Sequence, residues 1–146
     1  MRNLRCLAVA SALLCAVAAV AGADGETGDL EVVEILVGTA LDREDRVPRD
    51  VGDVFPAGTE KLWCWTRVRG AAGPTDVVHV WYHEGGTRAR VVLPVRSPDW
   101  RTWSSKRLLS AWTGRWEVKV LDADGLVLAA TRFIVGNAMT DGEDTE

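Results

Sequence analysis

The chain alternates apolar and polar residues with period two between Leu30 and Val135, and Gly, Pro and Asp interrupt the alternation at short intervals. Successive side chains of a strand point to opposite faces, so this period predicts strands rather than helices. We expect strands at residues 30–39, 61–69, 77–83, 88–95, 114–121 and 126–135, with 103–109 as either a strand or an irregular crossing. The pattern predicts an all-β fold, an antiparallel β-sandwich of about seven strands that is immunoglobulin-like in size.

The connections between these strands carry their own signals. Residues 42–60 contain two prolines and many charges, so we expect a long connection that Phe55 pins to the core. Gly and Pro predict a turn at residues 70–74, and Glu84-Gly85-Gly86 predicts a hairpin turn.

The last two strands should form a hairpin. Asp124-Gly125 is a pair favoured in two-residue loops. That loop would place Trp116 opposite Phe133 and Glu117 opposite Arg132. The register would give one apolar face and one charged cross-strand pair.

Residues 1–23 have the features of a secretory signal. Two arginines precede an apolar run from Leu7 to Val20, and Ala21-Gly22-Ala23 is an A-x-A site. We expect cleavage before Asp24, with cleavage after Ala21 as the alternative. The run is shorter than the roughly 20 residues of a membrane span, so the prediction is an exported protein of the periplasm or the extracellular space, with no span in the mature chain.

The expected mature chain is acidic at both ends. Losing the two arginines of the signal takes the formal net charge from −4 to −6. Residues 24–29 predict a flexible acidic leader and residues 137–146 a disordered acidic tail, around a single domain at 30–136. An acidic, exported chain argues against a nucleic-acid partner.

No constellation for catalysis or metal binding stands out in the sequence. Cys64 would be the one cysteine after cleavage, and its apolar neighbours predict a buried, inert thiol. His79 and His83 would lie about 13 Å apart on a strand, too far to share a metal, and His79 alone would bond to backbone at the edge of the core. No serine lies in G-x-S-x-G, and we expect no cofactor.

All seven tryptophans lie between residues 63 and 116, in the most basic part of the chain. Indoles stack on sugars and cations, and arginine pairs with carboxylate or phosphate. Alternation puts Trp63, Trp65, Arg67 and Arg69 on one face, which could bind an acidic glycan or a protein. The alternative is that most indoles fill the core. The candidate binding residues are Trp63, Trp65, His79, Trp81, Arg101, Trp103, Ser104 and Lys106.

Three indoles, Trp100, Trp103 and Trp112, lie in the least regular segment, so these are the ones we expect to be partly exposed. For residues 101–106 two roles stay open. Arg101 or Ser104 could bond carbonyls of a crossing between sheets, since buried backbone groups need partners. Alternatively, Arg101, Ser104 and Lys106 could meet an anion.

Several short runs resemble a known family when they are taken in order. They are Lys61 to Val68, His79-Val80-Trp81-Tyr82, Arg101 to Lys106, Gly114 to Val118, Asp122 to Gly125 and Phe133-Ile134-Val135. Over residues 60–136 the chain is similar to the bacterial secreted family catalogued as domain of unknown function 2914. The resemblance implies an extracytoplasmic β-rich domain and brings no catalytic assignment.

The residues and the resemblance together predict a non-enzymatic binding domain for an envelope polysaccharide or protein. A structural or assembly partner of another envelope protein, without a small-ligand site, is the first alternative. An uncharacterised hydrolase is the second.

Overall fold

The structure is a computed structural model that describes residues 29–136, all of its regular elements being strands. The nine strands are β1 (Glu31–Asp42), β2 (Val47–Val51), β3 (Val54–Phe55), β4 (Lys61–Arg69), β5 (Thr75–His83), β6 (Gly86–Val95), β7 (Asp99–Arg107), β8 (Gly114–Leu121) and β9 (Val127–Val135). Within these residues no helix is long and apolar enough to cross a membrane. The signal sequence and the acidic tail predicted above lie outside the described residues, as does most of the acidic leader.

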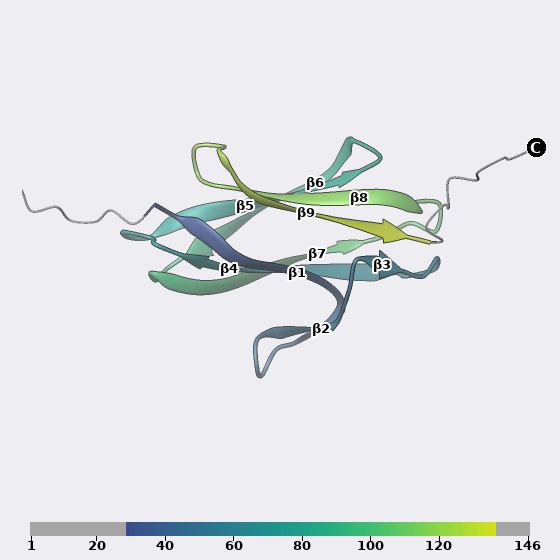
Figure 1. Cartoon of the computed structure of the whole chain (residues 1–146), viewed down its shortest axis with the longest axis horizontal. Coiled ribbons are helices and arrows are strands. Elements are labelled where there is room, and N and C mark those ends of the chain that lie inside the picture. Colours follow the sequence, from purple (N-terminus) through teal and green to yellow (C-terminus); the bar gives the residue numbers. More distant parts are fainter. Residues whose placement is uncertain (1–28, 137–146) are drawn as a thin grey trace, which may run out of the picture.

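The strands form two sheets that pack face to face (Figure 1). Sheet A has the order β2-β1-β4-β7, and sheet B has the order β3-β9-β8-β5-β6. The predicted sandwich is confirmed, with nine strands where about seven were expected. The immunoglobulin-like assignment stays a prediction.

The prediction for residues 42–60 was wrong, because this stretch contains two strands. β2 pairs with the end of β1 in an antiparallel hairpin, and β3 pairs with β9 in parallel, the exception in an otherwise antiparallel fold. The Asp42 carboxylate accepts the backbone N–H groups of Glu44 and Asp45, which shapes the hairpin turn. Phe55 does pin the segment, since it is 3% exposed and meets Phe133 edge to face.

Residues 103–109, predicted as either a strand or an irregular crossing, lie largely in a regular strand, β7, which begins at Asp99 and ends at Arg107. The turn predicted at Glu84-Gly85-Gly86 is confirmed, because β5 ends at His83 and β6 begins at Gly86. Both Glu84 and Gly85 have positive φ there, as a type I′ hairpin turn requires.

In the last hairpin the predicted pairs, Trp116 with Phe133 and Glu117 with Arg132, are both present. The two-residue loop was wrong. Asp122 N–H donates to the Leu126 carbonyl and closes a three-residue loop, and a bulge in β9 restores the register.

The core between the sheets divides into two apolar clusters. One contains Trp81, Trp116 and Phe133, and the other contains Val77 and Val120. Polar side chains that are almost fully buried lie between the two clusters on β4, β5 and β7; they are Thr66, His79, Thr102 and Ser104. This layer contains several of the residues singled out in the sequence.

The β1–β2 hairpin bends out of sheet A, away from sheet B (Figure 1). The Trp65 indole N–H donates to the carbonyl of Arg46 in the hairpin turn, over 2.9 Å. This contact leaves Trp65 only 3% exposed although it lies on the outer face of its sheet. The hairpin therefore covers part of that face and forms a wall beside the rest of it.

Gly38 permits the bend, because any Cβ at this position would overlap the backbone carbonyl of Arg49 in β2. We predict that Gly38→Ala lowers the free energy of unfolding by about 2 kcal/mol, the usual cost of overpacking. Chemical denaturation measures the change. Gly73→Ala is the matched control, since nothing lies within 4 Å of its Cβ position, and equal stability of the two variants would contradict the account.

Candidate binding face of sheet A

Strand alternation divides the predicted site residues between two surfaces. On β4, Trp63 and Trp65 point outward, while Leu62 and Cys64 are fully buried. Directly opposed residues of an antiparallel pair share a face. Because Trp65 pairs with Trp103 and Arg67 with Arg101, these side chains lie on the outer face of sheet A.

The other predicted residues point inward. Ser104 pairs with buried Cys64, and Lys106 pairs with buried Leu62. His79 and Trp81 come from β5 of the facing sheet and are 0% exposed. The structure therefore separates Arg101 and Trp103 from Ser104 and Lys106, and it contradicts the hypothesis that Arg101, Ser104 and Lys106 meet one anion.

The inward residues form a hydrogen-bonded chain between the sheets. The Trp81 indole N–H donates to Ser104 Oγ over 3.0 Å, and Ser104 Oγ lies 2.7 Å from His79 Nδ1. On the other side of the imidazole, His79 Nε2 lies 3.2 Å from Thr66 Oγ1. Thr66 Oγ1 in turn donates to the Thr102 carbonyl, over 3.4 Å.

Counting donors assigns the tautomer of His79. If Nε2 carries the proton, it donates to Thr66, whose hydroxyl donates to the Thr102 carbonyl, and the Ser104 hydroxyl donates to Nδ1. Every donor then has an acceptor. With the proton on Nδ1, the Ser104 oxygen would accept from both Trp81 and His79, and the Ser104 hydroxyl proton would have no acceptor among these groups. We therefore assign the neutral Nε2–H form.

His79 and Cys64 have the environment of core residues. Burial lowers the pKa of His79 to about 4, because a charged imidazole would lose its hydration. Burial also raises the pKa of the Cys64 thiol far above its ordinary range, which suits the predicted inert thiol. His79 was expected at the edge of the core with a backbone partner, and instead it is fully buried between two hydroxyls.

Burial of neutral His79 predicts a specific loss of stability in acid. The unfolded histidine takes up a proton near pH 6.5 and the folded one only near pH 4, so between these values acid favours the unfolded state. We predict that the stability difference between pH 7 and pH 4 is larger in the wild type than in His79→Gln, by roughly 3 kcal/mol. Denaturant titrations at both pH values measure it. Equal losses in the two proteins would refute the assignment.

The outer face of sheet A combines indoles with cations. Trp63 and Trp103 are half-buried, and the Lys61 ammonium lies 4.2 Å from the centre of the Trp63 ring. Arg101 and Arg107 are exposed, and neither forms an ion pair within residues 29–136. Arg67 on this face has acidic neighbours, Asp99 and the opposed Glu34, so the positive charge without an ion-pair partner is that of Arg101 and Arg107.

A hollow of about 370 Å³ opens beside the tip of the β1–β2 hairpin. We call it the arginine pocket; it is lined by Arg46, Arg67, Ser97, Asp99, Trp100 and Arg101. Arg46 comes from the hairpin turn and has a positive φ of 57°. The Trp65 indole holds the carbonyl of this same residue, so the hairpin contributes a fixed wall to the pocket.

Asp99 is the single acid of the arginine pocket. Its two oxygens accept from Arg67 over 2.8 and 2.6 Å, and one also accepts from Arg69 over 3.2 Å. These hydrogen bonds, with that from Arg67 the stronger, hold the pKa of Asp99 at about 2. Arg46 and Arg101 have no acidic partner among the described residues, so the pocket keeps an excess of positive charge.

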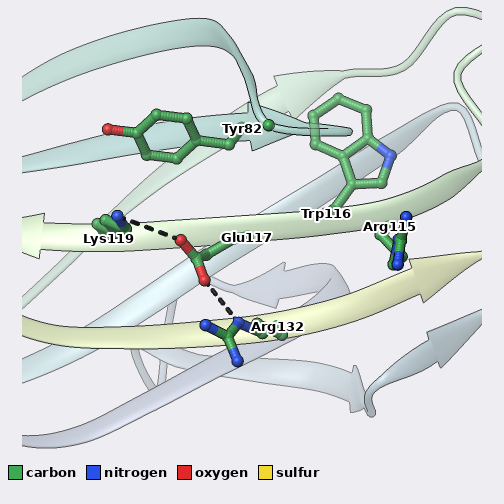
Figure 2. Close-up of a pocket in the computed structure, with 7 residues that line it drawn as sticks. Tyr82, Arg115, Trp116, Glu117, Lys119 and Arg132 are labelled. Atoms are coloured by element: carbon green, nitrogen blue, oxygen red, sulfur yellow. Dashed lines mark hydrogen bonds and ion pairs between the residues drawn. The ribbon is translucent and has the colours of Figure 1, made fainter.

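A second hollow, of about 290 Å³, lies against sheet B (Figure 2), and its cations differ from those of the arginine pocket in having acidic partners. Its three cations all have carboxylate partners. Glu117 meets Arg132 at 2.7 Å and Lys119 at 3.5 Å, and Glu84 meets Arg115 at 3.5 Å. This surface is a neutralised charge network, and the arginine pocket is the better candidate for an anionic ligand.

The sequence found part of the candidate site and missed part. Trp63, Trp65, Arg101 and Trp103 do share one face, and the partial exposure of Trp100, Trp103 and Trp112 is confirmed. Arg46 was missed because its segment had no strand signal. Thr66 could have been found, since it is a polar residue on an otherwise apolar face of β4.

The family model described as "Protein of unknown function (DUF2914)" matches residues 74–135, from β5 to β9. The resemblance is confirmed over this segment. The matched residues include all of sheet B except β3 and also include β7, so they contain Arg101 and Trp103 but not Arg46. No curated protein matches the sequence.

Solved structures give distant likenesses. A β-glucosidase from Kluyveromyces marxianus aligns with 11% identity and a TM-score of 0.42, over 74% of this chain and 14% of that one. An endonuclease/exonuclease/phosphatase from Beutenbergia cavernae aligns with 20% identity and a TM-score of 0.32, over 72% of this chain and 35% of that one. This chain thus spans a small part of either protein, and neither likeness contributes to the functional argument.

Proposed function

We propose that the protein is an exported, non-enzymatic domain that binds an acidic polysaccharide of the cell envelope on the outer face of sheet A. The observation that carries the proposal is the arginine pocket, in which Arg46 and Arg101 lack acidic partners within residues 29–136. Half-buried Trp103 lies on the same face, one cross-strand pair away from Arg101.

The ligand chemistry follows from this combination. A guanidinium pairs with a carboxylate through two parallel hydrogen bonds, and an indole face packs on the apolar face of a sugar ring. A polymer of uronic acids presents both groups at regular intervals. Such a chain could place one carboxylate at Arg101 while a neighbouring ring stacks on Trp103.

The buried groups support a binding role over a catalytic one. A catalytic base or nucleophile must reach its substrate. His79, Ser104 and Cys64 are each at most 5% exposed, and the first two are bonded to one another. On the binding face, Asp99 is held ionised by two arginines, and a carboxylate with so low a pKa is a poor general acid near neutral pH.

The test is calorimetric titration with polygalacturonate, with a neutral glucan of similar length for comparison. We predict that the wild type binds the polyuronate, binds the glucan much more weakly, and loses affinity as salt rises, since salt screens the exposed charges. Arg101→Gln should weaken polyuronate binding about tenfold, the usual effect of losing one charged hydrogen-bond donor.

Arg90→Gln is the matched control, because Arg90 is also exposed and forms no ion pair within residues 29–136, but lies on β6 of the other sheet. Its affinity for polyuronate should equal that of the wild type. Equal binding of the two polymers, or equal losses in the Arg90 and Arg101 variants, would contradict the proposal. Absence of polymer binding together with specific crosslinking to an envelope protein would favour the structural or assembly role.

A further inference from the structure

A second set of cations lies away from the arginine pocket, where the edge strands β6 and β7 border the opening between the sheets. Trp112 in the loop before β8 is its centre. The Arg88 guanidinium lies 4.9 Å from the centre of the Trp112 ring, and the Lys106 ammonium lies 5.1 Å from it. Because both distances are measured to the same ring centre, the two charges are at most about 10 Å apart.

Arg88 lies at a β-bulge in the pairing of β5 with β6. Trp81 pairs with Ala89 and the next residue, Tyr82, pairs with Thr87, so Arg88 is an additional residue in β6. Such bulges change the direction of a side chain and are frequent beside functional sites. Here the bulged arginine extends to an indole from a different part of the chain.

Lys106 belongs to β7 of sheet A, the sheet opposite that of Arg88. It shares the inward face of β7 with Ser104 because it pairs with fully buried Leu62. Neither Lys106 nor Arg88 has an acidic partner among the described residues. Two sheets thus bring two uncompensated positive charges to one aromatic ring.

The backbone of Trp112 is anchored on both sides. Its N–H donates to the Leu109 carbonyl over 2.9 Å, and its own carbonyl accepts the Trp116 indole N–H over 2.9 Å. Trp116 is 2% exposed and stacks on Phe133 in the core. The Trp112 ring, which both cations contact, is therefore fixed to the core although it lies in a loop.

The neighbouring His83 adds an unused acceptor. Its Nε2 donates to the Thr113 carbonyl over 2.8 Å, and its ring lies 6.1 Å from that of Trp112. The buried Nδ1 has no hydrogen-bond partner among the described residues, whereas most buried polar atoms have one. A buried polar atom without a hydrogen-bond partner therefore belongs to the ring beside Trp112, the residue that both cations contact.

From this arrangement we infer a second ligand site, which binds a phosphate monoester through Arg88 and Lys106 beside Trp112. A phosphate group has enough oxygens to engage the fork of an arginine and a lysine together, and it can carry two negative charges. A carboxylate has two oxygens and one charge, so one arginine satisfies it. The site therefore prefers phosphate, in contrast to the uronate-binding face.

The structural alternative is that both side chains only protect the opening of the sandwich. An inward-pointing lysine on an edge strand prevents pairing with other chains, and long cationic side chains cover apolar rings with their stems. This alternative predicts changes in solubility or stability and no preference among anions.

The experiment is calorimetric titration of the full chain with inorganic phosphate, with acetate at equal ionic strength for comparison. We expect phosphate to bind in the millimolar range and acetate to bind more weakly. Arg88→Gln and Lys106→Gln should each weaken phosphate binding about tenfold. Arg90→Gln and Arg101→Gln should leave it unchanged, which separates this site from the uronate-binding face.

Thermal melting shows whether each variant folds, and Arg88→Met, which keeps an unbranched apolar stem beside Trp112 but removes the charge, replaces Arg88→Gln if that protein does not. Equal binding of phosphate and acetate would overturn the inference, as would wild-type phosphate affinity in both the Arg88 and the Lys106 variants. Glycerol 3-phosphate and vesicles of phosphatidic acid then distinguish the sources. Binding of the first alone indicates a soluble phosphorylated ligand, and binding of both indicates a lipid headgroup.

Discussion

The hydrogen-bonded chain from the Trp81 indole to the Thr102 carbonyl is the interaction on which the remaining structure depends. Apolar contacts between sheets are not directional and tolerate sliding, whereas hydrogen bonds require particular distances and angles. This chain joins Trp81 and His79 of sheet B to Thr66 and Ser104 of sheet A. It therefore fixes how the sheets face one another, between two apolar clusters that contain most of the buried hydrophobic side chains.

The same hydrogen-bonded chain also determines which side chains lie on the outer face of sheet A. Because Thr66 and Ser104 point inward, their neighbours Trp65, Arg67 and Trp103 must point outward. The outward side chains would form an ordinary sheet face if the β1–β2 hairpin did not bend over them. Its contact with Trp65 converts a flat face into a walled pocket. The buried polar chain and the candidate binding face outside it thus both result from the alternation of side chains along β4 and β7.

The sequence was informative where one face of a strand is clearly more apolar than the other. Alternation together with turn signals predicted the sandwich. The pairing of Trp116 with Phe133 was predicted from a two-residue loop, and it is present because the bulge in β9 compensates for the three-residue loop. Alternation could not sort the residues of β7, since both Trp and Ser occur on both faces of that strand. Nor could it find β2 and Arg46, because a short edge strand with charged residues and a proline looks like a loop. Those features come from tertiary contacts that local pattern does not encode.

The tautomer of His79 tests this account most directly. Long-range 15N–1H correlation spectra at neutral pH distinguish the two ring nitrogens and report which of them carries the proton. The hydrogen-bonded chain predicts a neutral imidazole protonated on Nε2, with Nδ1 accepting from Ser104. A proton on Nδ1, or a charged imidazolium at neutral pH, would mean that the chain does not join the sheets as described.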